Sequence, residues 1–122
     1  MVRVTYDVIA LTQQMPDVRT LLDGLSAAGD DLRLDVPEHG GVIQLFDDEG
    51  GPLLSVEAPV LVQVPGEAER LLGPSAAGLR PPLWWVEARA AERQGAPELA
   101  RVFADALVNK LGGVVWVAED QP

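Results

Sequence analysis

Cysteine is absent from this chain of 122 residues, and histidine and lysine occur once each. The lack of cysteine excludes disulfides, thiolate nucleophiles and cysteine-ligated zinc sites, and it is typical of a reducing compartment. The lone histidine, His39, lies beside two glycines in an expected turn, which favours a solvated residue over a metal ligand. The sequence therefore predicts neither a bound metal nor a cofactor.

Basic residues are also scarce, since 9 of them stand against 19 acids and give a formal charge of −10. Such a charge repels phosphate backbones and anionic lipids, so we expect no nucleic-acid or membrane partner. It favours a basic protein partner, although solubility alone would also explain it. No apolar run reaches the roughly 18 residues of a membrane helix, and no signal peptide is evident. We therefore expect a soluble cytoplasmic protein.

Motifs for catalysis are missing as well. No Gly-x-Ser-x-Gly, P-loop or dinucleotide-binding pattern occurs in the chain. The densest acidic segment, Asp47–Glu49, lacks the ligand spacing of a calcium loop and is more typical of a hairpin tip exposed to water. The sequence therefore favours a protein that is not an enzyme.

The apolar pattern predicts both helices and strands. Leu99, Val102, Phe103 and Ala106 form one stripe of a helix. Pro59 interrupts an otherwise strand-like run and marks a bulge, an edge or a break between two strands. The expected helices cover 16–28 and 97–111, with one or two helical turns over 66–72 and a loop over 73–82. The expected strands cover 3–11, 31–36, 42–46, 53–64, 83–88 and 113–117.

These elements predict an α+β fold. Short hairpin connections favour a mixed or mainly antiparallel sheet of five to six strands, with the two main helices packed on one face. We expect one globular domain over 1–118 and a disordered tail over 119–122.

Two kinds of residue are candidates for a functional site. Trp84 and Trp85 are successive strand residues and point to opposite faces, so at least one of them is a candidate interface anchor. Asp47 and Asp48 would offer acidic contacts to a basic partner. The second kind is a pocket carboxylate that could bind a ligand. Glu57 and Glu87 both interrupt apolar strands, where they either face solvent or form a buried acidic site.

Four segments of the chain are similar to a known family: Tyr6–Thr12, Met15–Asp17, Ser55–Pro65 and Trp84–Arg89. Together they resemble the N-terminal part of an uncharacterised actinobacterial family whose members occur near genes of a type VII (WXG100-type) secretion system. The resemblance spans most of the chain, but its motifs are not catalytic and imply no active-site residue. Family members are longer, which implies that this chain is one domain of a larger product or a short relative.

Three functional hypotheses remain open. The first is a non-enzymatic protein–protein interaction module, acting as an adaptor, a chaperone-like factor or an immunity-type protein toward a basic partner such as a helical secretion substrate or a toxin. The second is a homo-oligomeric structural domain, paired through an edge strand or the Trp85 face. The third is a small-ligand binder or carboxylate-based hydrolase with Glu57 or Glu87 in a pocket.

Overall fold

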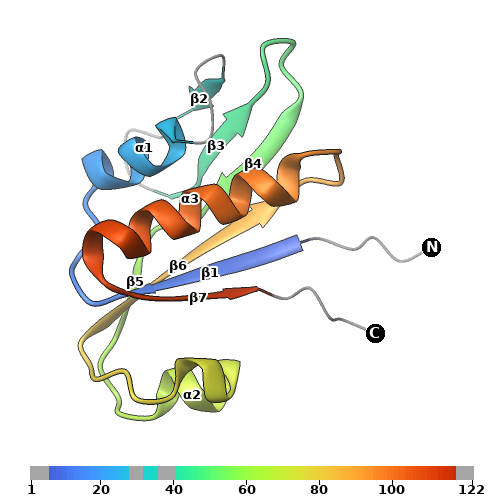
Figure 1. The fold of residues 1–122 in the computed structure, drawn as a ribbon. Helices are drawn as coiled ribbons and strands as arrows, with labels where there is room; N and C mark the ends of the chain where they lie inside the picture. The colour runs from blue at the N-terminus through green and yellow to red at the C-terminus, as the bar shows by residue number, and fades with distance from the viewer. Residues whose placement is uncertain (1–5, 28–31, 36–40, 118–122) are drawn as a thin grey trace.

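The computed structural model describes residues 6–27, 32–35 and 41–117, and within these ranges it contains a seven-stranded sheet and three α-helices (Figure 1). The strands are β1 (Tyr6–Thr12), β2 (Arg33–Asp35), β3 (Ile43–Phe46), β4 (Pro52–Val56), β5 (Val60–Val62), β6 (Leu83–Ala90) and β7 (Gly113–Val117). The helices are α1 (Val18–Ser26), α2 (Glu67–Leu72) and α3 (Ala96–Leu111), with a short 3-10 turn, η1 (Pro74–Ala76).

All strand pairs in the sheet are antiparallel, in the order β2-β3-β4-β6-β1-β7, and β5 pairs with β6 beyond the end of β4. The expected α+β class with a mainly antiparallel sheet is confirmed. The strand number is slightly higher than the expected five to six, because the run over 53–64 forms two strands instead of one.

The break between β4 and β5 lies at Pro59, where a strand break was one of the expected outcomes. Val56 lies opposite Ala88 and Val60 lies opposite Trp85, so the β4–β5 segment contains one more residue than the facing part of β6. Pro59 has no amide proton to give to the ladder, which accounts for a bulge at this point. As a result, β4 and β5 lie one after the other along the same edge of β6.

The main core lies between the sheet and the helices α1 and α3, which both cover one face as expected (Figure 1). Alternate residues of the central strands point into this core, among them Val8 and Ala10 of β1 and Val86 of β6. Phe103 of α3 is completely buried and is the largest of the fully buried side chains. We call this side of the sheet the helix face.

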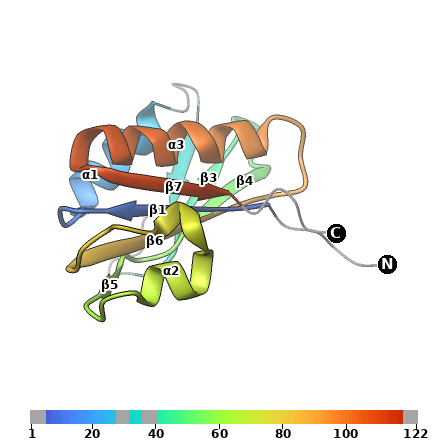
Figure 2. The ribbon, with the colours of Figure 1, turned by 60° about the horizontal axis from the view of Figure 1, so that its bottom comes forward.

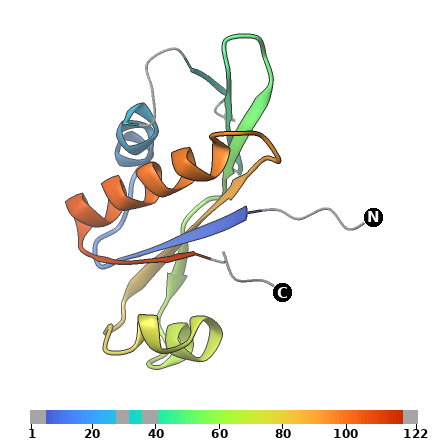
Figure 3. The same ribbon diagram turned by 45° about the vertical axis from the view of Figure 1, so that its right-hand side comes forward.

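The opposite side of the sheet, which we call the open face, is covered by the described residues only at one end. There α2 and η1 pack Ala68 and Ala76 against Ile9, Leu11 and Leu83. Figure 2 shows α1 and α3 above the sheet and α2 below it, and Figure 3 shows α2 beyond one end of the strands. Helical turns were expected near 66–72, but the sequence did not place them on the second face.

The helix ends differ in detail from the expected ones. Asp17 is the N-cap of α1 and accepts a hydrogen bond from the Thr20 amide at 2.8 Å, so Pro16 lies before the cap and does not occupy the first helical position. An aspartate whose carboxylate accepts from the amide three residues later is a stronger signal for the start of a helix than the neighbouring proline. Pro97 does lie in the first turn of α3, and the expected loop over 73–82 contains η1.

Several predictions fall outside the described residues, namely the turn with His39, the closing of the first helix at Gly29 and the tail over 119–122. Among the residues that the structure describes, no helix combines the length and the apolar character needed to cross a membrane.

Gly113 allows β7 to begin directly beside β1. Its φ is +128°, and a Cβ built on it would lie 1.8 Å from the carbonyl oxygen of Leu11. We expect Gly113→Ala to lower the free energy of unfolding by about 3 kcal/mol or more, through backbone strain and this overlap. Urea denaturation followed by circular dichroism measures the change. Gly78→Ala is the matched control, because Gly78 also has a positive φ but has no atom within 4 Å of the added Cβ, so only about 1 kcal/mol is expected.

Candidate functional site

The two neighbouring tryptophans of β6 lie on opposite faces of the sheet, and both are half-buried. Trp84 is paired across the strands with Thr12 and Leu61 on the helix face, and Trp85 is paired with Leu11 and Val60 on the open face. Trp85 also packs against the apolar residues beneath α2. It therefore joins the covered end of the open face to the uncovered part.

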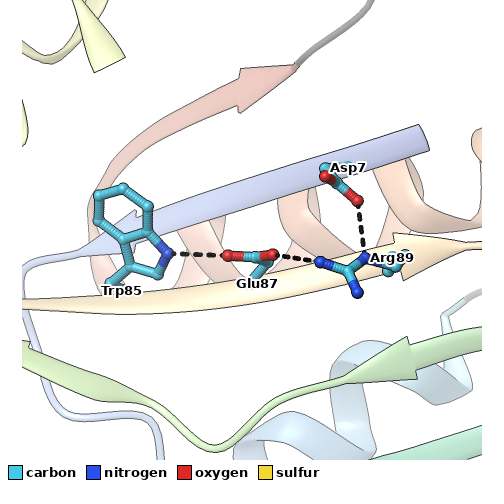
Figure 4. Close-up of polar contacts among 4 residues, drawn as sticks. All are labelled: Asp7, Trp85, Glu87 and Arg89. Atoms are coloured by element: carbon cyan, nitrogen blue, oxygen red, sulfur yellow. Dashed lines mark hydrogen bonds and ion pairs between the residues drawn. The ribbon is translucent and has the colours of Figure 1, made fainter. Parts of the chain in front are cut away.

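A row of polar side chains continues from Trp85 along β6 on the open face (Figure 4). The Trp85 indole Nε1 donates to Oε1 of Glu87 at 3.4 Å, and Nη2 of Arg89 donates to the other oxygen of Glu87 at 3.2 Å. Nε of Arg89 also donates to Oδ1 of Asp7 on the neighbouring strand β1, at 3.1 Å. This row orients Glu87 through both of its carboxylate oxygens.

The Asp7 carboxylate raises the pKa of Arg89 above its usual value, chiefly through their hydrogen bond and then through its charge, and Glu87 and Glu57 act in the same direction. Two carboxylates, those of Asp7 and Glu87, therefore pair with one guanidinium on this part of the open face. The balance is an excess of negative charge.

Glu57 and Glu87 line the same shallow hollow, which has a volume of about 330 Å³. The Glu57 amide donates to the backbone carbonyl of Glu87 at 3.0 Å, and this contact places the two residues side by side at the bulge. Glu57 is exposed and Glu87 is half-buried, so neither carboxylate lies in a closed interior. The remaining lining residues are Gly41, Val42, Ala58, Val60 and Trp85. We call this depression the acidic hollow.

A second depression of about 370 Å³ lies between β5 and α2 and is mostly apolar. Its walls include Val60, Val64 and Leu71, which are 58%, 60% and 53% exposed, together with Trp85. We call it the apolar groove, and it shares Val60 and Trp85 with the acidic hollow. Trp85 was a sequence-based candidate, but Val60, Val64 and Leu71 were not. The apolar run after Pro59 was a signal for Val60 and Val64.

Asp47 and Asp48 lie away from both depressions, in the turn between β3 and β4. The Asp47 carboxylate accepts from the amides of Gly51 at 2.7 Å and Glu49 at 2.9 Å, and it pairs with Arg93 at 2.6 Å. These contacts lower the pKa of Asp47, the Gly51 amide most of all. Asp47 thus holds its turn and ties it to the segment before α3, while Asp48 is exposed.

No family model matches the chain, and neither a curated protein nor a solved structure gives a match. Among the described residues, no three histidine, aspartate or glutamate side chains come together in a group that could hold a metal ion. The candidate site is therefore defined by the open face itself, with Trp85 between the acidic hollow and the apolar groove.

Replacing Asp47 by alanine removes two amide contacts and the ion pair with Arg93. We expect a fall of several degrees in Tm at pH 7, measured by calorimetry. Because the pKa of Asp47 is lower in the folded state, its contribution is complete above the unfolded value near 3.8 and is lost as the pH falls through the folded value. The Tm difference from the wild type should therefore narrow below about pH 4. Asp48→Ala, in the same turn, should change Tm little at either pH.

Proposed function

We propose that this protein is a non-enzymatic protein–protein interaction module of the cytoplasm, with the open face of its sheet as the binding surface. The observation that carries the proposal is the position of Trp85, half-buried between the two depressions and bordered by exposed apolar side chains. Contiguous apolar surface with a polar rim is typical of interaction sites, and tryptophan is enriched among the residues that dominate binding.

The apolar part of this surface is concentrated in one place. Val60, Val64 and Leu71 are all more than half exposed, and all three line the apolar groove. Exposing such side chains to water costs free energy, which a partner that covers them would recover. The row of Glu87, Arg89 and Asp7 supplies oriented polar groups beside them, as at the rim of an interface.

The resemblance to a family found near type VII secretion genes extends this proposal. It favours an adaptor or chaperone-like role toward a basic protein, such as a secretion substrate, over a role as an immunity-type protein. The overall charge of −10 would speed association with such a partner.

Small-ligand binding is a second candidate, favoured by the acidic hollow in which Glu57 and Glu87 meet. Hydrolysis by this pair has less support. Glu57 is exposed and Glu87 is half-buried, so neither carboxylate lies in the closed, water-poor environment that adjusts a general acid or base to its task.

The proposal is tested by affinity capture from host lysate with wild-type protein and with two open-face variants, Val60→Lys and Trp85→Ser. A partner that co-elutes in stoichiometric amount with the wild type should be lost from both. Val60 is exposed, so its variant should fold normally even if Trp85→Ser is less stable.

The matched control is Val102→Lys, which introduces the same charge at an exposed position of α3, remote from the open face. It should retain the partner. Loss of the partner from the control as well, or retention by Val60→Lys and Trp85→Ser, contradicts the placement of the binding surface.

A further inference from the structure

We propose that the open face binds a peptide segment of its partner in which the side chain of an arginine or lysine lies close to an apolar side chain. The cationic group occupies the acidic hollow against Trp85, and the apolar side chain occupies the apolar groove. This inference rests on the proposed function and names the chemistry of the partner that the same surface takes.

The acidic hollow has the composition of a site for a cationic side chain. An indole ring and two carboxylates line it, and the electron-rich face of an indole attracts ammonium and guanidinium groups. Glu87 is already oriented by Trp85 and Arg89, so it loses little freedom when a cation arrives. Arg89 offsets only part of the charge, because it pairs with Asp7 as well as with Glu87.

The apolar groove lies directly beside this hollow. Val60 and Trp85 belong to the walls of both depressions, so they form a ridge between them. Two side chains of one segment can therefore lie on either side of the ridge. In an extended segment, residues two positions apart point to the same side and suit this arrangement.

Charge selects the occupant. A second copy of this chain would bring the same excess of −10 and would place carboxylates opposite Glu57 and Glu87, which costs free energy. A nucleic acid would be repelled for the same reason. A segment that is both basic and apolar satisfies the acidic hollow and the apolar groove together.

The probe is the capped peptide acetyl-Gly-Leu-Gly-Arg-Gly-Leu-Gly-amide, titrated into the ¹⁵N-labelled whole chain and followed by NMR. We expect shifts at the Trp85 indole N–H and at the amides of β5, with the β3–β4 turn unmoved. Replacing arginine by glutamate in the peptide should abolish binding, and replacing both leucines by serine should weaken it at least about fivefold.

The protein variants separate local from general electrostatics. The double variant Glu57→Gln/Glu87→Gln should weaken peptide binding at least about fivefold, because it removes both carboxylates of the acidic hollow. The matched control Glu98→Gln/Asp105→Asn removes the same charge from exposed positions of α3 and should weaken it less than about twofold. Equal losses for the two double variants would overturn the proposal.

The outcomes also distinguish this inference from the proposed function. If the peptide does not bind, while Val60→Lys still loses the captured partner, the surface is an interface and the inference about its occupant is overturned. If the peptide binds as expected but no partner depends on Val60, the inference holds and the proposed function fails. Dimerisation in light scattering that Val60→Lys abolishes would assign the surface to a second copy and overturn the inference.

Discussion

Strand β6 is hydrogen-bonded along both edges, by β1 on one side and by β4 followed by β5 on the other. The alternation of its side chains therefore fixes what each face of the sheet can be. Val86, Ala88 and Ala90 are small or branched apolar residues and fit beneath α3, whereas Trp85, Glu87 and Arg89 all point the other way. One strand therefore contributes side chains both to the main core and to the open face.

The polar row of β6 on the open face stays accessible because α2 is short. Its six residues cover Leu11 and Leu83 at one end of the sheet, and no other described helix covers the rest of β6 on this face. The bulge at Pro59 adds to this asymmetry, since it separates β4 from β5 just after Glu57, which lies beside Glu87 in the register of β4 with β6. A continuous strand in place of the bulge would reverse the faces of the residues that follow it.

The elements with a strong local pattern could be predicted from sequence, and the surface that they form together could not. The existence of α3 and the proline in its first turn are local signals, as is the break at Pro59. The expected stripe was partly wrong, since Val102 is exposed and the buried face of α3 is formed by Ala100, Phe103, Ala104 and Leu107. The meeting of Glu57 with Glu87 depends on the register between two strands that are far apart in the sequence, and no local pattern encodes it. The same limit applies to Val64 and Leu71, whose exposure depends on where α2 packs. Asp47 was a candidate for acidic contacts, but its oxygens hold the turn because Gly51 and Arg93 lie within reach only in the folded chain.

The pairing of β1 has a consequence for how the chain is made. Both neighbours of β1, β6 and β7, lie in the last third of the sequence, so on the ribosome this strand waits without a partner until Leu83 and the residues after it have emerged. At usual rates of translation that wait lasts on the order of ten seconds. During it, Val8, Ile9 and Leu11, which are buried in the finished protein, stay in contact with water. Although β1 is synthesised before the other described strands, it is therefore among the last of them to be buried.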